Sequence, residues 1–267
     1  MVIVIEENKN HSEVIGNPNA PYINQLAGQY SLATNYFGVA PVSLPNYFML
    51  TVGDQITTGD SYAGIVTDDN IVRELTNAGK TWKVYAEDLP SVSYLGGDTG
   101  NYIKHHNPFV YLSDVQSDPS QQGNVVPFPQ FATDLANNAL PNYAFIVPNV
   151  IDDGHSCPTS LPQCGDSGEL QNTDTWLKTN IASLLANASF SNGLLAITWD
   201  SGDMDFSYGG GQVPLILAGD GVRTGFVSTT FYQHQSLLRL SMEHLGLSPN
   251  LGAAATAPDM SDMVPSP

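Results

Sequence analysis

The sequence predicts an α/β fold, in which a mostly parallel central sheet carries helices on both faces. Short runs of β-branched and aliphatic residues alternate along the chain with segments of helical periodicity. Several of these runs are apolar throughout, as strands buried on both faces of a parallel sheet are. The composition, with 42% hydrophobic and 13% charged residues, is that of a globular protein and not of a disordered one.

The first predicted strand, residues 2–5, is a β-branched run that ends abruptly at Glu6, Glu7 and Asn8. Similar strands are predicted at 82–85, 143–147, 194–199 and 213–217. Helical patterns occupy 22–28, 46–52, 70–78, 128–138, 173–186 and 233–245. No internal repeat interrupts this alternation, so we expect residues 1–267 to form a single domain.

The charge of the chain limits its partners. With 26 acidic and 8 basic residues the net charge is −18, which excludes nucleic acid as a partner because a polyanion is repelled. An anionic substrate therefore needs a bound divalent cation, which reverses the local field. No apolar run reaches the roughly 18 residues that span a bilayer, and no signal peptide is visible after Met1.

The two cysteines, Cys157 and Cys164, lie seven residues apart in a segment rich in proline and glycine. This spacing predicts a small loop closed by a disulfide, since a lone close pair without further cysteines is rarely a zinc site. A disulfide favours an extracytoplasmic or secreted protein whose leader is absent from this chain. A cytoplasmic location is the alternative.

Three segments carry chemistry-bearing side chains, and each has a simpler explanation. Glu7 and Asn8 offer hard oxygen ligands at a strand end, where ligands of open α/β sheets sit, or they merely begin a solvent loop. Ser43 precedes a helical segment whose free amides favour an anion, or it only caps that helix. The strand ending at Asp200 is followed by Asp203 and Asp205, which supply ligands or form an acidic turn.

Considered together, these segments resemble the phosphoesterase family of bacterial acid phosphatases and phosphatidylcholine-hydrolysing phospholipases C, within the alkaline phosphatase superfamily. The resemblance runs in order over nearly the whole chain. It is carried by Glu7-Asn8, Ala20-Pro21-Tyr22-Ile23-Asn24, Ser43-Leu44-Pro45-Asn46-Tyr47, His106-Asn107-Pro108-Phe109-Val110-Tyr111, Pro148-Asn149 before His155, Asp174-Thr175-Trp176-Leu177, Thr198-Trp199-Asp200, Val213-Pro214 and the segment from His234 to Leu247.

The resemblance implies that Ser43 is a nucleophile that forms a phosphoseryl intermediate, which water then hydrolyses. A divalent metal, Mg²⁺, Mn²⁺ or Ca²⁺, would be held by Glu7, Asn8, Ser43 and Asp200. His106 and His155 are the candidates that bind the phosphoryl oxygens or protonate the leaving group.

A wider superfamily pattern adds a second metal, with Zn²⁺ as a candidate. Asp152, Asp153 and His234 follow the order of that pattern, although His234 can equally pack inside the last helix. The chain departs from the family in having Pro41-Val42, Ser201 and Gln212 where a metal or phosphate contact is common. Asp203 or Asp205 is the candidate replacement for the carboxylate that Ser201 lacks, and the sequence does not choose between them.

The expected activity is hydrolysis of phosphate monoesters, because the chain lacks the extra C-terminal domains of the larger phospholipases C. The partner would then be a small phosphorylated substrate. A phospholipase C that cleaves phospholipid head groups is the alternative within the same chemistry, and a catalytically impaired binding module on the same fold is the alternative of another class.

Overall fold

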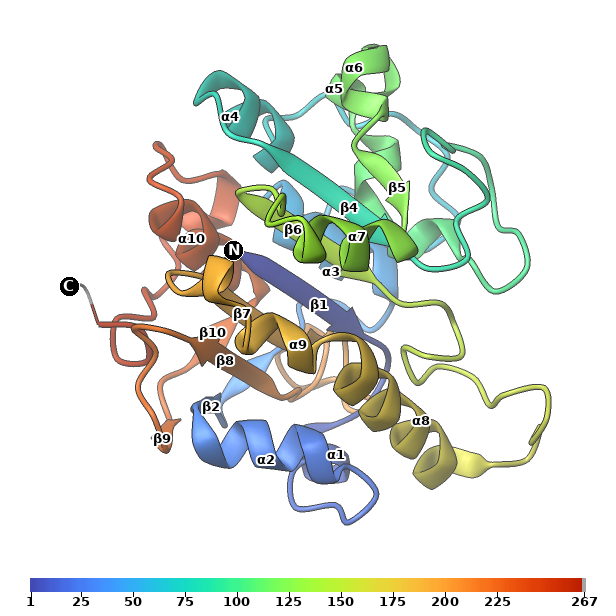
Figure 1. The fold of residues 1–267 in the computed structure, drawn as a ribbon, viewed down its shortest axis with the longest axis vertical. Coiled ribbons are helices and arrows are strands. Elements are labelled where there is room, and N and C mark those ends of the chain that lie inside the picture. Colours follow the sequence, from blue (N-terminus) through green and yellow to red (C-terminus); the bar gives the residue numbers. More distant parts are fainter. Residues whose placement is uncertain (266–267) are drawn as a thin grey trace.

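A twisted eight-stranded sheet lies at the centre of the protein, whose computed structural model describes residues 1–265 (Figure 1). Its strand order is β5-β4-β6-β1-β7-β8-β2-β9, and a separate pair is formed by β3 and β10. Within the described residues β8 is the only strand of the large sheet that runs antiparallel to its neighbours. The predicted fold class, a mostly parallel sheet, is confirmed.

The strands are β1 (Val2–Glu6), β2 (Ser31–Ala33), β3 (Tyr36–Phe37), β4 (Trp82–Ala86), β5 (Val125–Pro127), β6 (Tyr143–Val147), β7 (Leu194–Trp199), β8 (Leu215–Gly219), β9 (Phe226–Ser228) and β10 (Tyr232–Gln233). The α-helices are α1 (His11–Val14), α2 (Pro21–Gln29), α3 (Ser43–Thr51), α4 (Ile71–Asn77), α5 (Ser113–Gln116), α6 (Pro119–Gln122), α7 (Pro129–Ala136), α8 (Gly165–Asn180), α9 (Ala182–Leu185) and α10 (His234–His244). Five 3₁₀ turns complete the described chain: η1 (Lys104–His106), η2 (Pro108–Tyr111), η3 (Ala188–Phe190), η4 (Ser207–Gly209) and η5 (Gly252–Ala255).

The apolar runs form the central strands because helices cover them on both sides. Every residue of β1, β6 and β7 is buried. Helices α7, α8 and α9 lie on one face of the sheet and α3 lies on the other, packed beside α10 (Figure 1). None of the described helices has the length and apolar character that crossing a bilayer requires.

Several predicted boundaries were wrong for local reasons. The predicted strand at 213–217 begins only at Leu215, and Pro214 before it has no amide hydrogen to donate to a neighbouring strand. The helix predicted at 173–186 begins earlier, at Gly165, and ends at Asn180. The strands β2, β3, β5, β9 and β10 were not predicted, because two or three residues are too few to show a period.

The parallel direction of β1, β6 and β7 places their carboxyl ends at one edge of the sheet. Glu7 follows β1, Asp200 follows β7, and the loop of residues 148–164 follows β6. Segments that lie nearly 200 residues apart in the sequence therefore meet at this edge, where α/β sheets bind their ligands.

Candidate active site

Glu7 is the centre of a buried cluster at this edge. Its side chain is completely buried, and its backbone amide donates to the carbonyl oxygen of Asp153 at 2.9 Å. The Ser43 hydroxyl donates to Glu7 Oε2 at 2.9 Å, and the Tyr47 hydroxyl donates to Glu7 Oε1 at 2.7 Å. His106 Nε2 lies 3.3 Å from the same Oε1. Glu7 therefore contacts the expected nucleophile directly.

Helix α3 presents Ser43 to Glu7. Ser43 and Tyr47 are four residues apart, so both lie on one face of the helix and reach the two oxygens of one carboxylate. Asn46 holds the preceding loop, because its Oδ1 accepts from the amide of Val39 at 2.7 Å and its Nδ2 donates to the carbonyl oxygen of Val42 at 2.8 Å. The backbone that carries Ser43, the predicted nucleophile, is thus held in place by hydrogen bonds.

The start of α3 already holds a carboxylate. The Leu44 amide, in the first turn, donates to Asp60 Oδ1 at 2.8 Å, and Pro45 has no amide hydrogen to offer. The sequence suggested instead that free amides of this turn hold a phosphoryl group. Asp60 therefore occupies one of the amides of this turn, that of Leu44.

Asn8 joins the ends of β1 and β7. Its φ of 41° lies in the left-handed region, which asparagine tolerates better than most residues. In this conformation its amide donates to Asp200 Oδ1 at 3.2 Å and its Nδ2 donates to the Ser201 hydroxyl at 3.0 Å. Ser201 in turn donates to Asp200 Oδ2 at 3.3 Å. Ser201 therefore connects Asn8 to Asp200 instead of supplying a carboxylate.

The loop after β6 brings two further groups to the cluster. Asp153 is buried, and its Oδ2 lies 3.2 Å from His106 Nδ1. Two residues later, His155 Nδ1 lies 2.8 Å from Asn8 Oδ1 and 3.9 Å from Glu7 Oε2. The Tyr47 ring stacks on the His106 ring, with centroids 5.6 Å apart and an interplanar angle of 11°. His106 thus contacts the carboxylates of Glu7 and Asp153 and stacks on the ring of Tyr47.

Charge pairing sets the protonation of the cluster. Burial disfavours the charge on Glu7, but the positive charge of His106 and the hydrogen bonds at its oxygens lower its pKa to about 2. Burial also disfavours charge on His106, yet Glu7 and Asp153 raise its pKa to about 9. Burial and the Glu7 charge raise the pKa of Asp200 well above its usual range. Burial raises that of Asp153 to about 6, although His106 opposes the shift.

The donor atoms of the cluster fit a divalent cation. Glu7, Asp153 and Asp200 are three buried carboxylates, and buried charges persist only when they are paired or coordinate a metal. Ligand atoms of Glu7, His106 and Asp153 lie within 4.8 Å of one another. His106 Nε2 and Asp153 Oδ2 are buried without a well-directed hydrogen bond. Two carboxylates with one imidazole suit Zn²⁺ or Mn²⁺ as well as Mg²⁺.

Two of the residues suggested for a second metal, Asp152 and His234, are engaged elsewhere. Asp152 accepts from Asn172 Nδ2 at 2.8 Å and is not part of the Glu7 cluster. His234 is fully buried, with Nδ1 2.7 Å from the Tyr36 hydroxyl and Nε2 2.5 Å from the carbonyl oxygen of Asp200. Asp203, the candidate replacement for the missing carboxylate, is exposed and lines the pocket that opens beside the cluster. Of the suggested group, only Asp153 reaches the cluster.

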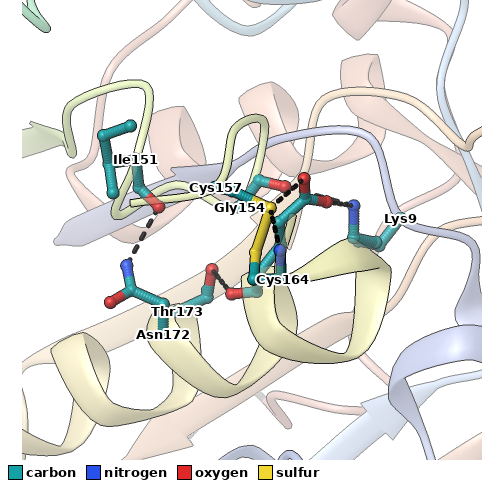
Figure 2. The surroundings of a disulfide bond; sticks show 8 residues. Lys9, Ile151, Gly154, Cys157, Cys164, Asn172 and Thr173 are labelled. Carbon is teal, nitrogen blue, oxygen red and sulfur yellow. Dashed lines mark hydrogen bonds and ion pairs between the residues drawn. A yellow bond between two sulfur atoms is a disulfide. The ribbon is translucent and has the colours of Figure 1, made fainter. Parts of the chain in front are cut away.

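The predicted disulfide between Cys157 and Cys164 is present, with Cα atoms 5.7 Å apart. Figure 2 shows that it ties the loop after β6 to the start of α8, with Lys9 lying beside it. Lys9 Nζ donates to Glu169 Oε2 at 2.9 Å and to the carbonyl oxygen of Gly154 at 3.1 Å. The disulfide and this ion pair hold the loop that carries His155.

A pocket of about 450 Å³ opens beside the cluster. Asn8, Lys9 and His155 line one part of it, and Pro41, Met204 and Phe206 line another. His155 is half-exposed there, whereas His106 is buried. The Glu7 carboxylate raises the pKa of His155, although burial opposes the shift. His155 is therefore the histidine of the cluster that a substrate in the pocket can contact.

Two functional features escaped the sequence reasoning. Tyr47 was assigned no role from the sequence, although its spacing of four residues from Ser43 was the signal that both share one helix face. The ion pair of Lys9 with Glu169 spans 160 residues of sequence, so no local pattern could reveal it.

Comparisons with known proteins identify the family of the chain. The chain matches the Phosphoesterase family over residues 7–248. It is 31% identical over 265 residues to the phosphatidylinositol-3-phosphatase of Mycobacterium tuberculosis, covering 98% of this chain and 82% of that protein. It is 29% identical over 246 residues to the phosphate-repressible acid phosphatase of Penicillium chrysogenum, covering 86% of this chain but only 55% of that protein.

Solved structures show the same fold at low sequence identity. A lipoteichoic acid synthase of Listeria monocytogenes superposes with a TM-score of 0.66 at 13% identity, covering 96% of this chain and 75% of that one. A protein of the alkaline phosphatase superfamily from Vibrio parahaemolyticus superposes with a TM-score of 0.64 at 12% identity, covering 96% of this chain and 69% of that one. The chain therefore belongs to the phosphoesterase family, with an alkaline-phosphatase-like fold, and is a phosphoric ester hydrolase.

Proposed function

We propose that the protein hydrolyses phosphate monoesters in a metal-dependent reaction that passes through a phosphoserine at Ser43. The hydrogen bond from the Ser43 hydroxyl to Glu7 carries the proposal, because it places a nucleophile against a buried group of metal-binding side chains. Monoesters are favoured over diesters because the relatives found are named phosphatases. The Cys157–Cys164 disulfide supports a location outside the cytoplasm.

The metal belongs at the Glu7 cluster. Glu7, Asn8 and Asp200 would hold it together with Ser43, and His106 and Asp153 are further donors on the other side of Glu7. When bound, a divalent cation lowers the pKa of the serine hydroxyl and neutralises charge on the phosphoryl oxygens.

The side chains of the site divide the remaining work. Tyr47 holds Glu7, and Glu7 Oε2 holds the Ser43 hydroxyl and takes its proton, so that the serine oxygen attacks phosphorus and the bond to the leaving alcohol breaks. His155, whose pKa is raised and which borders the pocket, gives a proton to the departing oxygen. Water then attacks the phosphoserine and gives a proton to His155, while the Ser43 oxygen leaves and takes its proton back from Glu7.

The decisive test is the pair of variants Ser43→Ala and Glu7→Ala, assayed on p-nitrophenyl phosphate with added Mg²⁺, Mn²⁺, Ca²⁺ or Zn²⁺. Ser43→Ala should abolish turnover and keep the bound metal, whereas Glu7→Ala should lose both. Ser241→Ala is the matched control, because this buried serine lies in α10 and its hydroxyl donates to the carbonyl oxygen of Leu237 in its own helix. Wild-type turnover by Ser43→Ala would refute the mechanism.

The substrate p-nitrophenyl phosphorylcholine separates the remaining candidates. Turnover of this diester without turnover of the monoester would indicate a phospholipase C. No turnover of either substrate between pH 4 and pH 9 would indicate a binding module that has lost its activity. Metal analysis of the purified protein gives the identity and the number of ions per chain.

A further inference from the structure

One loop exposes large apolar side chains beside the active-site pocket. The segment of residues 201–211 follows β7, and in it Met204, Phe206 and Tyr208 are exposed by 81%, 61% and 66%. Met204 and Phe206 line the pocket together with Pro41, and Asn8 and His155 line the same pocket. Apolar side chains exposed to this degree in one short segment are uncommon on a soluble surface and often mark a binding site.

The loop is held rigidly in spite of its exposure. Its base is closed by a hydrogen bond from the Gly202 amide to the Gly210 carbonyl oxygen at 2.7 Å. Inside it, Asp205 accepts from the amides of Ser207 at 2.9 Å and Gln212 at 2.8 Å. These bonds give Asp205 a structural role within the loop. The apolar side chains therefore form a preformed surface, which binds a ligand at a lower entropic cost than a mobile segment does.

The backbone of the loop is also strained. Met204 and Tyr208 both have a φ of 53°, a conformation that side chains of this size rarely adopt. Such strain persists only where the surroundings enforce it, and it concentrates at functional sites. Tyr208 is supported by the rings of Phe37 and Phe231, at centroid distances of 4.6 and 4.8 Å. Holding these side chains at the pocket therefore lowers the stability of the folded protein.

The rest of the pocket offers little to a charged or highly phosphorylated alcohol. Asp166, Glu169 and Asp203 line it and repel further negative charge. Lys9 is the only lysine or arginine of the lining within residues 1–265, and Glu169 already pairs with it. A leaving group with additional phosphates would meet carboxylates, whereas an apolar one would meet Pro41, Met204 and Phe206.

We propose that the substrate is a phosphomonoester of an apolar alcohol, whose alkyl or aryl part packs against Pro41, Met204 and Phe206 while its phosphate faces Ser43. This inference rests on the proposed function and names the substrate class of the same site. The three side chains determine specificity and take no part in the chemical step.

The experiment measures kcat/KM for n-alkyl phosphates from ethyl to hexyl, all as dissolved monomers. Burying one methylene group yields at most about a fourfold gain, so kcat/KM should rise steadily with chain length in the wild type. In the double variant Met204→Ser/Phe206→Ser, the ratio of the hexyl to the ethyl value should fall at least tenfold. Val227→Ser is the matched control, because Val227 is 52% exposed on the edge strand β9, and its ratio should equal that of the wild type.

The outcomes separate this inference from the function on which it rests. Absence of turnover for every alkyl phosphate and for p-nitrophenyl phosphate would refute the proposed function itself, whereas turnover of p-nitrophenyl phosphate without any alkyl phosphate would overturn this inference alone. Turnover that does not depend on chain length, or a double variant that lowers the ethyl and hexyl values equally, would overturn the specificity surface alone. A larger ratio for the double variant would overturn it as well.

An apolar phosphomonoester can come from a membrane or from solution, and a second arm distinguishes the two sources. Phosphatidic acid in phosphatidylcholine vesicles is offered alongside hexyl phosphate. Turnover of both, with the same loss in the double variant, identifies a lipid source, and turnover of hexyl phosphate alone identifies a soluble one. Turnover of glucose 6-phosphate faster than both would overturn the proposal.

Discussion

Acidification should destabilise the protein through His234. This histidine is the first residue of α10 and is fully buried beside Asp200. Both ring nitrogens are engaged: Nδ1 lies 2.7 Å from the Tyr36 hydroxyl and Nε2 lies 2.5 Å from the carbonyl oxygen of Asp200. A neutral ring satisfies both contacts, because Nδ1 accepts from the phenol and Nε2 donates to the carbonyl. A protonated ring has no acceptor for the Tyr36 hydroxyl and carries an unpaired charge in the core.

The size of the effect follows from the pKa. Burial lowers the pKa of His234 from 6.5 to about 4. Because the folded pKa is depressed, the stabilising contribution is present above pH 6.5 and is lost as the pH falls toward 4. A difference of about 2.5 units corresponds to about 3 kcal/mol of unfolding free energy between pH 7 and pH 4, at 1.36 kcal/mol per unit.

Urea unfolding of wild type and His234→Gln at pH 7 and pH 4 measures this contribution. Glutamine retains an amide hydrogen for the Asp200 carbonyl and does not titrate, so the variant should lose about 3 kcal/mol less on acidification than the wild type. His244→Gln, at the exposed end of the same helix, is the control and should keep most of the wild-type acid dependence. Identical acid dependence in wild type and His234→Gln would refute the reasoning.

Three further predictions concern the supports of the site. Tyr47→Phe removes the phenol that donates to Glu7, so it should cost about 2 kcal/mol of unfolding free energy and weaken Mn²⁺ binding, measured by titration calorimetry; unchanged affinity would contradict this. Lys9→Met leaves Glu169 without its ion-pair partner, so it should lower the free energy of unfolding in urea by about 3 kcal/mol. The double variant Lys9→Met/Glu169→Leu should recover part of this loss. Cys157→Ser/Cys164→Ser opens an eight-residue loop, so it should lower the free energy of unfolding in urea by up to about 2.5 kcal/mol, the entropy of closing that loop. A greater loss would contradict an explanation by loop entropy alone.

The central strands were predictable because burial on both faces leaves a direct mark on the sequence. The apolar runs that became β1, β6 and β7 are continuous, so they indicated a parallel sheet without further information. The short strands β3 and β10 left no such mark. They pair with each other across nearly 200 residues of sequence, and long-range contacts alone define them.

The candidate site was predictable only in part. Glu7, Asn8 and Asp200 follow strands whose direction could be inferred, and the structure brings them together. Asp152 and Asp153 are neighbours in the sequence, and nothing in their spacing indicated that only Asp153 faces His106. The direction of each side chain depends on the turn after β6, which packing against α8 and the disulfide holds.

The sequence by itself determined the fold class and the family, and it predicted Ser43 as the nucleophile, because strand patterns, motif order and helix starts are local properties. Only the tertiary structure decided which groups contact Glu7, that His234 is buried and engaged, and that the loop after β7 exposes Met204 and Phe206 at the pocket. These features depend on distances between segments far apart along the chain, and such distances exist only once the sheet has assembled.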